Sequence, residues 1–262
     1  MLKFSANLSL LFTELPLIDR FHAARKAGFK AVEIQFPYEL SIDTLKSVLK
    51  DTELPLVLIN IPAGDLMQGG DGLACVPGRE QDFSTALELA EAYARELNVP
   101  TVNALAGRQP EGLLRDECLN TLTENLQKAL PIFRKNAIQL VTEAINIFDM
   151  PRFLIHSLND MQLLCQQVPG LLMQFDGYHM ARMGEDIEAA LNHYLPQIGH
   201  IQFADAPGRH EPGTGSLELA HFFSLIRDSH YTQWCGAEYI PSKPTTETLQ
   251  WLSRWQTTTA SS

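Results

Sequence analysis

The sequence predicts an α/β protein with a single (β/α)8 TIM barrel, and three observations support this fold class. Short apolar, β-branched segments alternate with amphipathic helical segments eight times within 262 residues. Several strand segments are apolar on both faces, which is typical of parallel strands covered by helices. The first strand-to-helix turn lacks the glycines that a doubly wound nucleotide-binding sheet typically carries there. Together these features favour the barrel over the doubly wound sheet.

The predicted strands are short, and most of them are followed by proline, glycine or polar residues. Proline ends the second and third strands, at Pro37 and Pro62. In chain order the eight strands cover residues 3–8, 31–36, 56–61, 101–106, 138–146, 171–176, 198–205 and 234–239. The stretch 138–146 is the most informative, because it places Glu143 near the end of an otherwise apolar strand.

The predicted helices carry apolar residues at helical spacing, and several have a recognisable beginning or end. Ser41 suits the N-cap of the second helix, Gly28 suits the C-cap of the first, and Gly170 follows the fifth. In chain order the eight helices cover residues 17–27, 41–51, 80–97, 114–135, 157–167, 186–195, 217–229 and 245–255. A glycine-rich loop at residues 63–78 has the length of a functional lid. We expect one barrel domain at residues 1–256 and a polar tail at residues 257–262.

Composition narrows the classes of partner. The net charge of −11 argues against nucleic acid as a partner, because phosphate binding needs a basic face. The four cysteines are scattered, without the spacing of a zinc site, a redox motif or a disulfide framework. The N-terminus does not resemble a signal peptide, and no apolar run approaches membrane-spanning length. We therefore expect a cytoplasmic protein without a membrane partner. The sequence does not decide its oligomeric state, and a homo-oligomer is possible.

Four consecutive predicted strands end on a side chain that carries oxygen. These side chains are Glu143, Asp176, Gln202 and Glu238. Active sites of TIM barrels lie at the C-terminal ends of the strands, so we expect the four to share one site. Strand alternation places Gln174 beneath Asp176 and His200 beneath Gln202. Buried carboxylates at one barrel mouth repel each other, so either their pKa values rise or a cation neutralises them.

Oxygen ligands of this kind suit one divalent metal ion, Mg²⁺ or Mn²⁺, better than a tetrahedral zinc ion. Four protein ligands leave two octahedral positions for an α-hydroxy carbonyl substrate, whose carbonyl the ion would polarise. A carboxylate on each side of such a substrate can move a proton between neighbouring carbons through an enediolate. Salt bridges at the barrel mouth would explain any one of the four side chains, but they explain all four together poorly.

The residues around these positions resemble the hydroxypyruvate isomerase family of the xylose-isomerase-like TIM barrels. The resemblance rests on residues 141–146, 175–180, 200–205, 210–215 and 236–239. Residues 62–65 and 74–80 resemble the lid region of the 2-oxo-tetronate isomerase branch of that family. The resemblance covers nearly the whole chain.

The resemblance implies a metal ion held by Glu143, Asp176, Gln202 and Glu238, with Glu143 and Glu238 as paired proton donor and acceptor. The implied reaction is that of an intramolecular oxidoreductase of the aldose–ketose type. It converts either 2-oxo-tetronate to 3-oxo-tetronate or hydroxypyruvate to tartronate semialdehyde, and the sequence does not decide between the two acids. The chain departs from the family at three positions, where Ala144 replaces proline, Ile59 replaces histidine and Ser216 replaces glutamate. The Ile59 departure puts a substrate-binding role of that histidine in doubt.

A 2-oxo acid adds a negative charge to an acidic barrel mouth, so a cationic side chain is expected nearby. Arg209 follows the seventh strand and can bind a carboxylate through two hydrogen bonds. His179 follows Asp176 closely enough to bind the substrate or to orient a metal ligand. His210 is a weaker candidate for substrate binding.

Three other functions compete with the isomerase. A ketose 3-epimerase on the same barrel would share the acidic ligands but usually places histidine where Gln202 stands. A DNA-repair endonuclease of the superfamily would need a histidine-rich multi-zinc site and a basic groove, which this acidic chain lacks. A non-catalytic sugar-acid binding protein would tolerate the loss of one paired glutamate, whereas both are present. The sequence therefore favours the isomerase.

Overall fold

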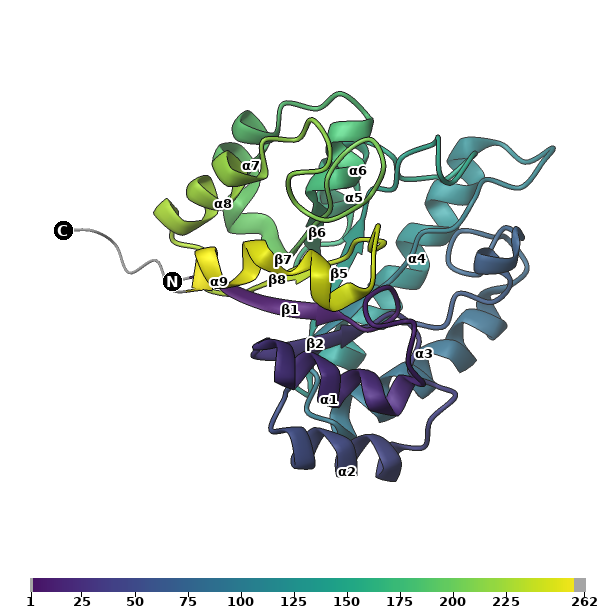
Figure 1. The fold of residues 1–262 in the computed structure, drawn as a ribbon. Helices are drawn as coiled ribbons and strands as arrows, with labels where there is room; N and C mark the ends of the chain where they lie inside the picture. The colour runs from purple at the N-terminus through teal and green to yellow at the C-terminus, as the bar shows by residue number, and fades with distance from the viewer. Residues whose placement is uncertain (1, 257–262) are drawn as a thin grey trace.

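A computed structural model describes residues 2–256 and has the predicted (β/α)8 architecture. Parallel strands follow one another in sequence order around a closed barrel. They are β1 (Lys3–Asn7), β2 (Ala31–Ile34), β3 (Leu56–Asn60), β4 (Thr101–Asn103), β5 (Gln139–Glu143), β6 (Leu172–Asp176), β7 (Ile198–Phe203) and β8 (Trp234–Ala237). β1 pairs with β8 and closes the barrel, and Figure 1 shows the purple β1 beside the yellow C-terminal segments. The predicted fold class is confirmed.

Helices occupy the connections and surround the strands (Figure 1). They are α1 (Leu17–Ala27), α2 (Ile42–Thr52), α3 (Glu80–Glu96), α4 (Arg115–Arg134), α5 (Leu158–Gln167), α6 (Gly177–Arg182), α7 (Ile187–Tyr194), α8 (Leu219–Asp228) and α9 (Gln250–Gln256). Three short 3-10 helices accompany them, η1 (Leu66–Gln68), η2 (Leu195–Gln197) and η3 (Thr245–Thr248). Within residues 2–256, none of the helices combines the length and the apolar character needed to cross a lipid bilayer.

The two predicted caps form as the sequence indicates. The Ser41 side chain accepts a hydrogen bond of 3.2 Å from the backbone N–H of Thr44, and it begins α2. Gly28 ends α1 in the left-handed region at φ 100°, which residues with a side chain rarely adopt. These local signals therefore set the helix ends independently of the barrel.

Several predicted segments differ from the structure, and the strand predicted at 101–106 ends at Asn103. The residues after β6 fold directly into α6, because the Asp176 side chain accepts the backbone N–H of Tyr178 at 2.8 Å and caps a new helix. The strand predicted at 138–146 ends at Glu143, and the helix predicted at 245–255 divides into η3 and α9. The polar tail predicted at residues 257–262 lies outside the described residues.

An aromatic cluster packs the outer face of the barrel against its last helices. Phe4 of β1 and Phe203 of β7 have ring centroids 5.8 Å apart, and both pack against Phe223 of α8 and Trp251 of α9. Such edge-to-face pairs stabilise a core by about 0.5–1.5 kcal/mol beyond the burial of their area. Because the apolar core lies outside the strands, the inner face of the barrel is free to carry polar side chains.

Candidate active site

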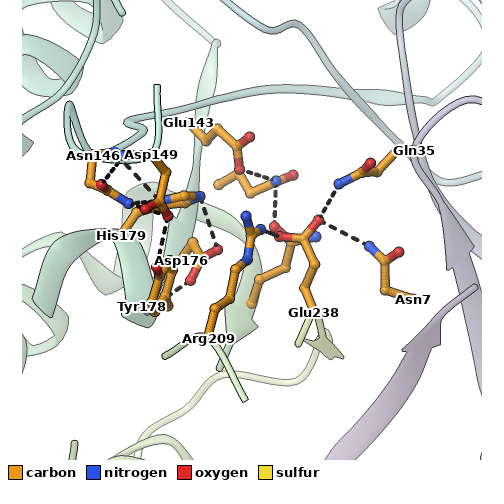
Figure 2. A network of polar contacts seen from close by, with 12 residues as sticks. Asn7, Gln35, Glu143, Asn146, Asp149, Asp176, Tyr178, His179, Arg209 and Glu238 are labelled. Atoms are coloured by element: carbon orange, nitrogen blue, oxygen red, sulfur yellow. Dashed lines mark hydrogen bonds and ion pairs between the residues drawn. The ribbon is translucent and has the colours of Figure 1, made fainter. Parts of the chain in front are cut away.

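The four predicted side chains meet at the C-terminal end of the barrel. Glu143 and Asp176 are the last residues of β5 and β6, and Asp176 lies level with Gln202 on β7. Glu238 follows β8 directly, and all four residues are buried. Figure 2 shows Glu143, Asp176 and Glu238 around a common centre, with Arg209 between Asp176 and Glu238. The barrel thus brings together the residues that the sequence places on separate strands.

Glu238 accepts hydrogen bonds from side chains on both sides of the β1–β8 pair that closes the barrel. Its Oε1 accepts hydrogen bonds from Asn7 Nδ2 at 3.0 Å and from Gln35 Nε2 at 2.8 Å (Figure 2). Its Oε2 accepts a charge-assisted hydrogen bond of 2.8 Å from Arg209. Arg209 has a backbone φ of 57°, which bends the loop after β7 so that its side chain returns over the mouth. Glu238 is therefore an oriented, charge-balanced carboxylate.

Glu143 and Asp176 are less well compensated. Burial, followed by the charges of Glu238 and Asp176, raises the pKa of Glu143 well above its ordinary value. Burial and the charge of Glu238 raise the pKa of Asp176 to about 7. Asp176 Oδ2 is buried and has no hydrogen-bond partner within residues 2–256. The mouth thus contains more negative charge than its protein donors balance, as expected from crowded acids.

These pKa shifts predict how the metal-free protein responds to pH. A carboxyl group whose pKa is higher in the folded chain than in the unfolded chain stabilises the protein at low pH. This contribution is lost as pH rises toward the folded pKa. His179 acts in the opposite sense, because burial and then Arg209 lower its pKa, but its contribution ends at the ordinary value of 6.5. Above pH 6.5, and up to the raised pKa of each acid, which is about 7 for Asp176, we therefore expect the free energy of unfolding in EDTA to fall, by at most about 1.4 kcal/mol per pH unit for each acid. Urea unfolding measures this slope, and Asp176→Asn should reduce it; an unchanged slope in that variant would contradict the assignment.

The residues at the mouth fit a divalent cation. Ligand atoms of Asp176, His179 and Glu238 lie within 4.8 Å of one another. An unpartnered Asp176 oxygen and raised pKa values of Glu143 and Asp176 are expected at a site that a cation would neutralise. His179 joins this group through a contact of 3.7 Å between its Nε2 and Asp176 Oδ2. Glu143 interacts electrostatically with both acids of the group.

Gln202 has a second set of contacts beneath the mouth. Its Oε1 accepts a hydrogen bond of 2.7 Å from Gln174 Nε2, which also donates to Glu143. Its Nε2 donates to Glu33 at 2.7 Å. Gln174 and His200 both point into the barrel, as strand alternation predicts. The role of Gln202 as a metal ligand stays a prediction.

Glu33 forms a polar centre inside the barrel, beneath the four predicted side chains. Its carboxylate accepts hydrogen bonds from Ser5 at 2.8 Å, Asn7 at 3.1 Å and Gln202 at 2.7 Å, and it contacts His200 Nε2 at 2.9 Å. Burial alone would raise the pKa of Glu33, but His200 and the hydrogen bonds from Gln202 and Ser5 lower it below the ordinary value. A charged residue inside the apolar β2 segment is the signal that points to this centre.

The predicted substrate-binding residues divide into two groups. His179 and Arg209 lie at the mouth beside the acids (Figure 2). The Nδ1 of His210 contacts the Ile240 carbonyl oxygen at 2.7 Å, and its ring is partly exposed. Ile59, which stands where the family carries histidine, is fully buried in the apolar core.

The chain is similar to known proteins over almost its whole length. The xylose isomerase-like TIM barrel family matches residues 21–255. The hydroxypyruvate isomerase of Escherichia coli (strain K12) is 40% identical over 98% of this chain and 100% of its own length. The 2-oxo-tetronate isomerase of Cupriavidus necator is 37% identical over 95% of this chain and 97% of its own. A crystal structure described as AP endonuclease, family 2, from Brucella melitensis is 35% identical with a TM-score of 0.93, over 97% of this chain and 99% of that one.

The predicted family is thereby confirmed: the chain belongs to the xylose isomerase-like TIM barrel family, within it to the hydroxypyruvate isomerase family, and is an enzyme of the isomerase type.

Proposed function

We propose that the chain is a metal-dependent isomerase of a small 2-oxo-3-hydroxy acid. The substrate is 2-oxo-tetronate, converted to 3-oxo-tetronate, or hydroxypyruvate, converted to tartronate semialdehyde. The observation that carries the proposal is the pair Glu143 and Glu238, two buried carboxylates at one mouth, where burial and then the charge of Glu238 raise the pKa of Glu143. The names of the most similar relatives support the substrate class.

The reaction moves one proton between two neighbouring carbons. One glutamate removes the C–H proton beside the substrate carbonyl, which leaves an enediolate, and the other glutamate protonates the adjacent carbon. A proton passes between the two substrate oxygens, so the product is an isomer of the substrate. After each turnover, proton exchange with the solvent restores the first glutamate to its charged form and the second to its protonated form. The raised pKa of Glu143 suits a group that must both accept and return a proton near neutral pH.

The other residues of the mouth hold the substrate and balance its charge. Glu143, Asp176, Gln202 and Glu238 would hold one divalent ion, proposed as Mg²⁺ or Mn²⁺, which when bound supplies Lewis-acid polarisation of the carbonyl. Arg209 keeps its Nε buried and without a hydrogen-bond partner among the described residues, although one of its terminal nitrogens is paired with Glu238. This free donor is suited to the substrate carboxylate.

The test is proton exchange in D₂O. The metal-loaded enzyme is incubated with each acid, and NMR follows both isomer formation and deuterium at the carbon next to the carbonyl. Metal-dependent isomer formation with deuterium uptake is expected, and the faster acid identifies the substrate. Exchange with a neutral ketose and none with either acid would transfer the assignment to a 3-epimerase. Binding of an acid without isomer or exchange would support the non-catalytic alternative.

Arg209→Ala is expected to raise KM for the 2-oxo acid by roughly 10- to 100-fold, because a charge-assisted hydrogen bond contributes about 1.5–3 kcal/mol. The KM for a neutral ketose should change far less. Arg182→Ala is the matched control, since Arg182 lies nearby on α6 but stacks on Phe148 instead. Steady-state kinetics measure both KM values. An equal increase of KM for the acid and for the ketose would contradict a role of Arg209 in binding the substrate carboxylate.

A further inference from the structure

The Asn146 side chain has an orientation that backbone donors fix. Its Oδ1 accepts the backbone N–H of Phe148 at 3.1 Å and that of Asp149 at 2.9 Å. A backbone N–H only donates, so the atom that faces both of them must be the amide oxygen. The amide nitrogen therefore faces the other way, where it lies 3.0 Å from Asp149 Oδ2 and 2.7 Å from His179 Nδ1.

This orientation determines where His179 carries its proton. Nδ1 faces Asn146 Nδ2, a donor, and the backbone N–H of Asn146 lies 3.4 Å from the same ring atom. A ring nitrogen that faces only donors has to accept, so the ring is neutral and its proton sits on Nε2. Nε2 in turn faces the mouth, 3.7 Å from the unpartnered Oδ2 of Asp176.

A further contact keeps Asn146 in place. Asp149 Oδ2, which accepts from Asn146, also accepts a hydrogen bond of 2.7 Å from the hydroxyl of Tyr178. Tyr178 directly precedes His179 on α6, so the loop after β5 and the helix after β6 are joined at two points (Figure 2). The Arg209 guanidinium lies over the Tyr178 ring, 5.3 Å from its centroid. The tautomer of His179 is therefore set by a connected network.

We propose that Asn146 is a positioning residue that holds His179 as its Nε2–H tautomer, so that His179 donates a hydrogen bond at the mouth and does not ligate the metal ion. A protonated Nε2 has no lone pair to offer a cation, which leaves the acids and Gln202 as ligands. The donated hydrogen bond goes to a substrate oxygen on which negative charge develops. Only this last step rests on the proposed function, because the tautomer is a property of the protein alone.

The tautomer is measured on metal-free protein labelled with 15N-histidine. Long-range ¹H–¹⁵N spectra distinguish a protonated ring nitrogen from an unprotonated one, and His179→Gln identifies the signals of His179. We expect a protonated Nε2 and an unprotonated Nδ1. In Asn146→Asp the new carboxylate accepts from the ring, so the proton should move from Nε2 to Nδ1. A protonated Nδ1 in the wild-type protein would overturn the proposal.

Kinetics connect the tautomer to turnover. Asn146→Asp should lower kcat by roughly 100-fold, the effect of losing one donor to a developing oxyanion, while KM changes much less. Asn192→Asp, the same change at an exposed position of α7, controls for added charge. In a His179→Gln background Asn146→Asp should have no further effect on kcat. An undiminished effect in that background would refute positioning through His179.

Two further readouts separate the outcomes. If Asn146→Asp does not fold, Asn146→Ala is used in its place. Because Nδ1 of His179 then loses the Asn146 donor, its signal should move toward that of a protonated nitrogen. An unchanged signal would refute the role of Asn146. If the wild-type protein isomerises neither acid but shows the expected tautomer, the proposed function fails while the positioning by Asn146 stands.

Discussion

Replacing Glu143 by glutamine is expected to lower kcat by roughly 100- to 10,000-fold and to leave the folded protein at least as stable as before. The substitution keeps the shape of the side chain but removes a group that has to accept and return a proton, and such groups contribute factors of about 100 to 10,000. Gln174 already donates to Glu143 Oε2, and the new amide can present its oxygen to the same donor. Turnover and deuterium exchange should fall together.

The stability of the same variant tests the electrostatic part of the argument. Glu143 repels Glu238 and Asp176 in the metal-free protein, and a neutral amide removes this repulsion. In EDTA at pH 8 the free energy of unfolding should therefore equal or exceed that of the wild type. Glu111→Gln, at an exposed position of the β4–α4 loop, is the matched control and should change neither quantity. Wild-type turnover in a metal-loaded Glu143→Gln enzyme would disprove the two-glutamate mechanism.

Much of this site was predictable because parallel strands end at one edge. Glu143, Asp176 and Glu238 each interrupt an apolar segment, and a closed barrel leaves such side chains nowhere to point except the mouth. The fold followed from the same pattern, since eight strand segments separated by helical ones favour a parallel sheet that closes. Residue type and strand order together carried this information.

Other features depended on geometry that residue types do not record. Arg209 reaches Glu238 because its backbone adopts a positive φ, which is uncommon for arginine and leaves no signature in composition. His179 is placed by α6, whose six residues are too few to show a helical period. The tautomer of His179 requires the loop after β5 to turn at Asn146, so that this loop contacts α6. These placements became visible only in three dimensions.

Glu33 shows a different limit. The structure places it beneath the mouth, among donors from β1 and β7. Gly236 makes this placement feasible, because a Cβ at that position would overlap the Glu33 carboxylate. The pairing of β1 with β8 brings these residues together, and no local pattern along the chain predicts this contact.

Glu33→Ala is accordingly expected to destabilise the protein by about 3–5 kcal/mol, because donors from Ser5, Asn7, Gln202 and His200 would lose their common acceptor inside the barrel. In a chain of this length that corresponds to a fall in Tm on the order of 10 °C. Urea unfolding and thermal scans measure the change. Glu33→Gln, which keeps one acceptor oxygen, should show a smaller loss. A loss below about 0.5 kcal/mol in Glu33→Ala would mean that the donors find other partners.

The pH dependence of that loss identifies its cause. The pKa of Glu33 is lower in the folded chain than its ordinary value of 4.5, so its contribution to stability is present above pH 4.5 and disappears as pH falls through the folded pKa. The difference in unfolding free energy between wild type and Glu33→Gln should therefore be constant from pH 6 to 8 and shrink below pH 4.5. A difference that stays constant into acid would point to lost packing instead of lost charge. Glu33 also accepts a hydrogen bond from the amide nitrogen of Gln202, whose amide oxygen accepts from Gln174. Because this contact orients a proposed metal ligand, the Glu33→Gln variant should also bind Mn²⁺ more weakly at pH 7. Calorimetry measures this affinity.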